Sequence, residues 1–96
     1  MAAYYTMMIR EEEGQNAGKW FPQFGDYDRS VVKTEEDAYW DSYTTKTPRK
    51  ERIPRKEYIR VIKTNSARQS EINKAIETLN DGWHDKWLSV MEKLVG

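Results

Sequence analysis

The stretch EYIRVIKT, residues 57–64, decides the fold class of this chain. Its side chains alternate along the backbone, with Tyr58 and Arg60 on one side and Ile59, Val61 and Lys63 on the other. A period of two residues is typical of a β-strand. A lone strand cannot satisfy its backbone hydrogen-bonding groups, so the chain must supply partners for it.

Two candidate partners lie near the N-terminus. Residues 3–10 (AYYTMMIR) are aromatic and apolar without helical spacing, which predicts a strand. Turn residues follow at 11–18, and residues 19–24 (KWFPQF) predict a second strand, antiparallel to the first. Pro22 has no N–H to donate, so this strand should lie at an edge of the sheet or carry a bulge.

Between these strands and residues 57–64 the sequence predicts a helix and a loop. The helix is expected over residues 29–43, with Asp28 or Ser30 as its N-cap and a positive φ at Gly25 in the preceding turn. Residues 44–56 contain Pro48 and Pro54, and they predict an exposed loop.

The C-terminal third is helical in pattern. Ser66 and Gln69 have the spacing of a capping box, which predicts a helix start at this point. Apolar residues then recur every three or four positions at Ile72, Ile76, Leu79, Trp83, Trp87, Val90 and Leu94. This phase favours one long helix, whereas Asn80-Asp81-Gly82 favours a break. Glycine in a helix interior costs about 1 kcal/mol, so we expect a break or kink near Gly82.

These elements predict an α+β fold in the order ββαβα. A small three-stranded antiparallel sheet would be covered on one face by helices. Residues 1–80 would form the α+β domain, and residues 81–96 its C-terminal helical extension. The predicted core consists of Tyr5, Met7, Ile9, Trp20, Phe24, Val32, Tyr39, Ile59, Val61, Ile72, Ile76 and Leu79.

Composition supports one small domain with an aromatic core. Apolar residues make up 38% of the 96 residues and charged residues 33%, but four Trp, six Tyr and two Phe can each bury a large area. The absence of cysteine and of a signal-peptide pattern predicts a cytoplasmic protein without disulfides. No apolar run is long enough to predict a membrane span.

Charge is sorted by segment although the chain is neutral overall. Residues 1–43 carry four cations and nine acids, residues 44–63 eight cations and two acids, and residues 64–96 four cations and five acids. The net charges of these segments are therefore −5, +6 and −1. Local potential of this kind steers encounter with a charged partner even when the net charge is zero.

The basic segment is therefore the first candidate for partner binding. Its candidate residues are Lys46, Arg49, Lys50, Arg52, Arg55, Lys56 and Arg60. They suit contacts to an acidic protein surface or to a nucleic-acid backbone. The alternative is a solvated loop that balances the acidic helix of the same molecule.

Trp83 and Trp87 are the second candidate, because tryptophan is enriched in binding hot spots. With Val90, Met91 and Leu94 they form an apolar stripe. This stripe either packs against the domain as core or remains as a patch for a partner or for a homodimer through the C-terminal helix.

The sequence predicts neither an enzyme nor a metal or cofactor site. Asp26 and Asp28 are more typical of a turn and a helix cap than of a calcium loop. His84 and Asp85 are adjacent on a helix and do not face each other. The serines have no evident base, so a nucleophile–base pair is not expected.

The N-terminal part resembles a group of small proteins encoded by phages and prophages. The resemblance spans residues 4–80 and is carried by YYTxxIRE from Tyr4 to Glu11 and by WxPxFGDYDR from Trp20 to Arg29. The ARQxxIN stretch beginning at Ala67 also belongs to it. Among such proteins with known roles, inhibitors of host defence, including anti-CRISPR proteins, are frequent.

The resemblance thus implies a non-enzymatic, phage-encoded inhibitor that acts in the cytoplasm of the host cell. It would bind and occlude a host protein or ribonucleoprotein complex. The alternatives are a nucleic-acid-binding accessory protein that uses residues 46–63, and a structural protein that self-associates.

Overall fold

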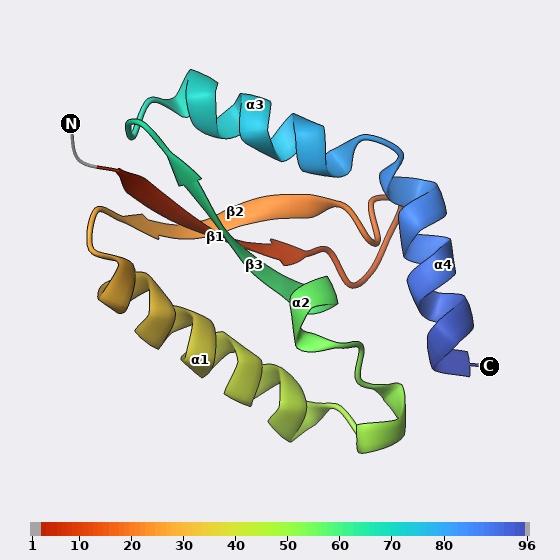
Figure 1. Cartoon of the computed structure of the whole chain (residues 1–96). Coiled ribbons are helices and arrows are strands. Elements are labelled where there is room, and N and C mark those ends of the chain that lie inside the picture. The colour runs from red at the N-terminus through yellow and green to blue at the C-terminus, as the bar shows by residue number, and fades with distance from the viewer. Residues whose placement is uncertain (1–2, 96) are drawn as a thin grey trace.

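The computed structural model describes residues 3–95 and contains one three-stranded antiparallel sheet with helices around it (Figure 1). The elements, in chain order, are β1 (Tyr4–Arg10), β2 (Trp20–Asp26), α1 (Arg29–Lys46), a 3₁₀ helix (Arg49–Glu51), α2 (Arg55–Tyr58), β3 (Ile59–Thr64), α3 (Gln69–Asn80) and α4 (Trp83–Val95). The strand order is β2-β1-β3. The predicted α+β class with three antiparallel strands and a C-terminal helix is confirmed.

Helices cover both faces of the sheet, so the predicted covering of one face is wrong. Met7 and Ile9 of β1 pack with Val32 of α1, whereas Met8 between them packs with Ile72 of α3. Figure 1 shows α1 and α3 on opposite sides of the strands. The physical reason is that the apolar run of β1 supplies side chains to both faces, as expected of a central strand buried on both sides.

The core consists of two apolar clusters, one on the α1 side of the sheet and one on the α3 side. All of the predicted core residues lie buried or half-buried in one or the other cluster. Prediction missed four buried hydrophobic side chains of the described residues: Met8, Tyr43, Ile53 and Tyr58. Met8 was missed because only one face of the sheet was expected to be covered. The other three belong to the cluster on the α1 side.

The edge position and the bulge, predicted for the Pro22 strand as alternatives, both occur. β2 is an edge strand, and its pairing with β1 shifts register between Met7, which faces Phe24, and Met8, which faces Pro22. The shift is a bulge that leaves Gln23 without a partner residue. A residue without an N–H is tolerated at an edge because no further strand needs that donor.

The turn between β2 and α1 differs from prediction at Gly25. Asp28 is the N-cap of α1, as predicted, and accepts a hydrogen bond from the Ser30 N–H at 2.9 Å. Gly25, however, does not have a positive φ. Glycine is needed there for space, since a Cβ at Gly25 would collide with the Tyr4 ring.

Residues 44–56 do not form the predicted loop. α1 continues to Lys46, and Pro48 and Pro54 each precede a short helical turn as its N-cap. Proline suits the start of a helical turn because its missing N–H would have no partner there. The second turn includes Tyr58, so β3 begins at Ile59 and not at Glu57.

The C-terminal helical region is broken near Gly82, as predicted, and Gly82 has a φ of +66°. The predicted capping box is wrong, because α3 begins at Gln69 with Arg68 as N-cap. The Ser66 hydroxyl instead accepts from the Arg68 N–H at 3.3 Å and donates to Glu71 at 3.0 Å. After the break, α4 lies across the end of the sheet beside the β1–β2 hairpin loop (Figure 1).

Candidate functional site

The cations of the basic segment divide into residues bound inside the fold and residues that face solvent. Arg52 belongs to the first group: its Nε and Nη2 donate to the carbonyl oxygens of Thr47 and Thr44 at 2.8 and 2.6 Å. These carbonyls lie at the C-terminal end of α1, where helix carbonyls lack intrahelical partners. Arg52 therefore closes the end of α1.

Arg55 is also bound internally. Its Nη2 contacts Asp37 at 2.5 Å and Glu36 at 3.8 Å, and its guanidinium lies 6.0 Å from the centre of the Trp40 ring. The hydrogen bond from Arg55 lowers the pKa of the Asp37 carboxyl, with help from Lys33. Two of the predicted partner-binding residues thus hold the segment against α1.

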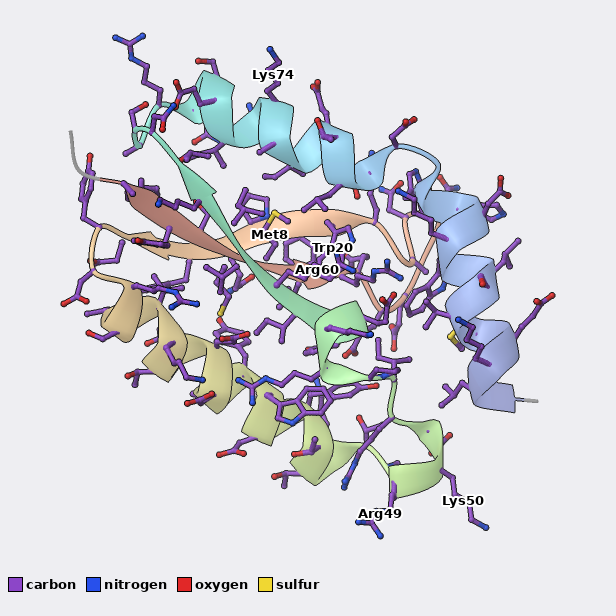
Figure 2. The ribbon with its side chains drawn as sticks, viewed as in Figure 1. Met8, Trp20, Arg49, Lys50, Arg60 and Lys74 are labelled. Carbon is purple, nitrogen blue, oxygen red and sulfur yellow. The ribbon has the colours of Figure 1, made fainter. Side chains whose placement is uncertain are left out.

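Arg49 and Lys50 form the exposed part of the segment. They lie in the 3₁₀ helix, and Figure 2 shows both side chains directed away from the sheet. Neither side chain has an ion pair or hydrogen bond within residues 3–95. The chain on either side is fixed, by Arg52 at the end of α1 and by Ile53, which is 5% exposed in the core. The two cations therefore stand on a turn whose position is set by the fold.

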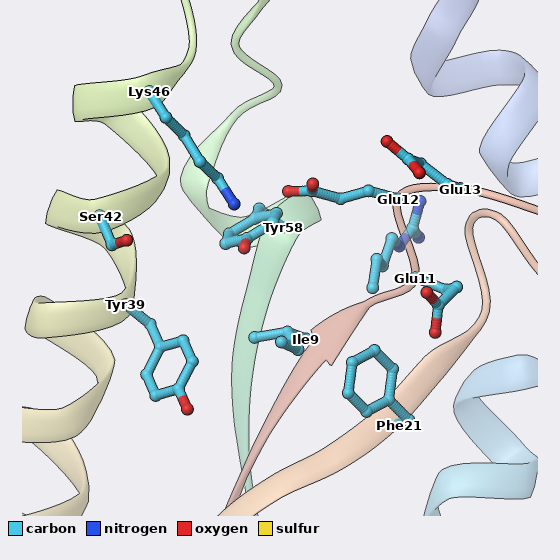
Figure 3. A pocket seen from close by; sticks show the side chains of 10 residues that line it. Ile9, Glu11, Glu12, Glu13, Phe21, Tyr39, Ser42, Lys46 and Tyr58 are labelled. Atoms are coloured by element: carbon cyan, nitrogen blue, oxygen red, sulfur yellow. The ribbon is translucent and has the colours of Figure 1, made fainter.

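Lys46 points elsewhere. It extends from α1 into an open cavity of about 440 Å³, toward Glu12 and Tyr58 (Figure 3). Glu11 and Glu13 also line this cavity. Lys46 thus belongs to α1 itself and faces acids of the hairpin loop, whereas the balancing interpretation named the acidic helix as the partner of the basic segment.

Burial favours the neutral form of two stacked tyrosines, namely Tyr58, which lines this cavity, and Tyr43. The rings of Tyr43 and Tyr58 stack with centroids 4.0 Å apart. Desolvation by burial, followed by the charge of Glu12, raises the pKa of Tyr58 to about 12. Desolvation also raises the pKa of Tyr43. A phenol with a raised pKa is a poor general base at neutral pH, so the pair is suited to packing.

Lys56 and Arg60 lie on the side of the sheet that α3 covers. Arg60 donates from Nε to the Lys56 carbonyl at 2.9 Å and pairs with Glu57 at 3.5 Å. Its guanidinium lies 5.3 Å from the centre of the Trp20 ring, and Figure 2 shows the two residues side by side. The predicted basic residues therefore do not form one continuous surface.

The apolar stripe of α4 is used inside the molecule. Trp87, Val90, Met91 and Leu94 pack against the core cluster on the α1 side. A Cβ on Gly18 would overlap the Trp87 side chain. Trp83 is half-buried and meets His84 edge-to-face, with ring centroids 5.4 Å apart. The interpretation of the stripe as packing is thus favoured over an open patch. Leu88, 50% exposed, is an apolar residue of α4 that faces solvent.

Sequence reasoning missed Arg10, whose side chain is only 4% exposed. Arg10 pairs with Glu57 at 3.5 Å, and its guanidinium lies 4.8 and 5.3 Å from the ring centres of Trp20 and Trp87. Desolvation lowers its pKa, Glu57 opposes this shift, and Arg60 adds to it. The available signal was an arginine at the end of an otherwise apolar strand, where burial of a charge is costly unless it has partners.

The acidic residues named in the sequence have structural contacts. Asp26 accepts from the Asp28 N–H at 2.7 Å, and Asp28 caps α1. Within residues 3–95, no three His, Cys, Asp or Glu side chains lie close enough together to hold a metal ion. None of the helices in this range is both long and apolar enough to pass through a membrane.

Comparison with known proteins returns no match to a family model, a curated protein or a solved structure.

Proposed function

We propose that this protein is a non-enzymatic binding protein that occupies and blocks an acidic surface of a protein or ribonucleoprotein complex. The observation that carries the proposal is the exposed Arg49–Lys50 pair on a turn anchored at both sides. Cations on a backbone that the fold holds in position lose less conformational entropy on binding than cations on a free loop. Both side chains are available to a partner, since neither is paired within residues 3–95.

The charge distribution supports the same role. The acids of α1 and of the hairpin loop lie in a segment of net charge −5, whereas the segment with the exposed pair carries +6. Such separation orients the molecule during encounter and disfavours wrong orientations by like-charge repulsion. The resemblance to phage-encoded proteins supports a complex of host defence as the partner, in the manner of an anti-CRISPR protein.

Capture of partners from extracts of bacterial host cells tests the proposal. Three full-length proteins are compared: the wild type, the variant Arg49→Glu/Lys50→Glu, and the charge-matched control Arg68→Glu/Lys74→Glu. Lys74 lies on α3 and points away from the molecule on the side opposite to Arg49 and Lys50 (Figure 2). We expect the wild type and the control to retain the same protein complex and the Arg49→Glu/Lys50→Glu variant to lose it.

Two outcomes would overturn the proposal. Retention of the complex by Arg49→Glu/Lys50→Glu would show that the turn is not the interface. Loss of all captured material after nuclease treatment, with binding to duplex DNA that falls steeply as salt rises, would instead identify a nucleic-acid-binding protein.

A further inference from the structure

A second open cavity, of about 600 Å³, lies on the side of the sheet that α3 covers and is strongly basic. The charged residues that line it are Arg10, Lys56, Glu57, Arg60, Lys86 and Lys93. Five cations thus face one acid. They come from the end of β1, from α2 and β3, and from α4, so the fold gathers them from three distant parts of the sequence.

The two lysines that α4 contributes to this cavity could not be recognised from the charge of their segment. Lys86 and Lys93 lie in a segment with net charge −1, and they are seven residues apart on one helix. This spacing is close to two turns, so both lysines lie on the same side of α4. Both are exposed residues without an ion pair within residues 3–95. Lysines that line a concave, uncompensated site raise the local concentration of anions.

Arg10 gives the second, independent sign of a ligand. Its side chain is nine-tenths buried or more, yet Nε and Nη1 have no hydrogen-bond partner within residues 3–95. A single carboxylate, Glu57, lies 3.5 Å from the remaining nitrogen, Nη2. A buried guanidinium with unsatisfied donors is destabilising. Nε and Nη1 are closed off from solvent, so an anion in the adjacent cavity would offset that cost through its charge and not through a hydrogen bond to either atom.

Size and chemistry indicate the class of anion. The volume lies within the range of roughly 300–1,000 Å³ that is usual for small-molecule sites, and it exceeds the needs of a single phosphate ion. The surplus of four cations over acids complements a ligand that carries several negative charges. Trp20 also lines the cavity, but the Arg10 and Arg60 guanidiniums lie 4.8 and 5.3 Å from its ring centre. Its ring is therefore already covered and does not offer a stacking surface to a nucleobase.

We propose that this cavity binds the polyphosphate chain of a small ligand, such as a nucleoside triphosphate, and recognises phosphate charge and not the base. Lys86 and Lys93 would contact the chain from α4, and Lys56 and Arg60 from the opposite wall. Arg10 would neutralise it at the base of the site. The site is separate from the Arg49–Lys50 turn, neither residue of which lines the cavity.

Calorimetric titration of the full-length protein tests this site with four probes: ATP, GTP, inorganic tripolyphosphate and orthophosphate. We expect saturable binding of ATP, GTP and tripolyphosphate with similar affinity, and much weaker binding of orthophosphate. Affinity should fall as salt rises, because the contacts are electrostatic. Each bound probe should also raise the unfolding temperature, because it binds only the folded state.

The discriminating variant is Lys86→Gln/Lys93→Gln, which leaves the packed side of α4 unchanged. It should bind tripolyphosphate about tenfold more weakly or worse, since two charge-assisted contacts are lost. The matched control Arg49→Gln/Lys50→Gln removes the same charge elsewhere and should bind as the wild type does.

Three results would overturn the inference: no saturable binding by the wild type, unchanged binding by Lys86→Gln/Lys93→Gln, or an equal loss in the control. ATP and GTP binding without tripolyphosphate binding would also overturn it, by showing base recognition. Loss of partner capture by Arg49→Glu/Lys50→Glu is independent of all these outcomes, so the two proposals can fail separately.

Discussion

The hydroxyl oxygen of Tyr43 accepts a hydrogen bond from the backbone N–H of Ile53 at 3.0 Å. Both residues are buried, Tyr43 at 6% and Ile53 at 5% exposure. The bond joins the end of α1 to the middle of the basic segment, ten residues further along the chain. This bond therefore helps to hold the proline-containing segment in position and to keep Ile53 of that segment in the core.

Tyr43→Phe tests this bond. The substitution keeps the ring that stacks on Tyr58 but leaves the Ile53 N–H buried without its acceptor. Loss of a partner by a buried donor costs about 1–3 kcal/mol, so the free energy of unfolding in urea should fall by that amount. Tyr27→Phe is the control, because Tyr27 is 57% exposed. Equal stability of Tyr43→Phe and the wild type would show that the bond contributes nothing.

The sheet could be predicted from the sequence, but the two-sided core could not. The strands could be predicted because their signals lie within a few residues of the sequence. Examples are the alternation over residues 59–64 and the proline at position 22 of an edge strand. Coverage of the second face depends on where α3 returns after β3, which is a relation between distant segments. The apolar pair Met7-Met8 was the available clue, because adjacent residues of a strand point to opposite faces.

Substitutions at Gly14 and Gly18 distinguish the cost of backbone strain from the cost of a side-chain collision. Both have a positive φ, +97° and +88°, but a Cβ on Gly18 would overlap Trp87, whereas a Cβ on Gly14 meets open space. Gly14→Ala should therefore cost about 1–3 kcal/mol from strain alone. Gly18→Ala should cost clearly more and should also change the tryptophan fluorescence of the folded protein.

The double variant Gly18→Ala/Trp87→Ala is the check on this interpretation. Its stability loss should be smaller than the sum of the two single losses, because removal of Trp87 also removes the collision. Additive losses, or equal losses for Gly14→Ala and Gly18→Ala, would mean that α4 does not press on the hairpin loop.

Alkaline pH should destabilise the protein through Tyr58, whose pKa rises from 10.0 to about 12 on folding. Below pH 10 the phenol is protonated in both the folded and the unfolded states, and its stabilising contribution is fully present. As pH rises toward 12 the unfolded chain releases this proton more readily than the folded chain does, so the free energy of unfolding falls.

Tyr58→Phe should have a smaller loss of stability than the wild type across this pH range. The measurement is the unfolding free energy in urea at a series of pH values on either side of pH 10, with Tyr27→Phe as the control. An identical pH profile for Tyr58→Phe and the wild type would contradict the assignment to this phenol.

The candidate site shows the same limit of sequence reasoning as the core. Residues 44–63 were correctly identified as basic, but Arg52 and Arg55 are used to brace α1, and Lys46 faces the acidic hairpin loop. Counting charges along the sequence cannot distinguish cations that are paired within the molecule from cations that are free to bind a partner. The reason is that intramolecular partners such as Asp37 lie far away in sequence. For the same reason Lys86 and Lys93 were overlooked.

Truncation after Asn80 tests the role of α4. Removal of this helix takes away four apolar residues that pack on the core, namely Trp87, Val90, Met91 and Leu94. Full burial of an aliphatic side chain is worth about 1.5–3 kcal/mol, and these residues are half-buried, so the total loss should be several kcal/mol. Small domains have little stability to spare, so residues 1–80 should unfold at a much lower urea concentration or aggregate.

Leu88→Ala provides the matched variant, because Leu88 lies on the same helix but is 50% exposed. It should leave stability nearly unchanged. Trp87 packs against the core, so a dimer formed through an intact α4 would have to use the exposed side of the helix, where Leu88 lies. Light scattering on Leu88→Ala and on the wild type therefore tests self-association through this side. A truncated protein that unfolds at the same urea concentration as the wild type would show that α4 is not part of the core.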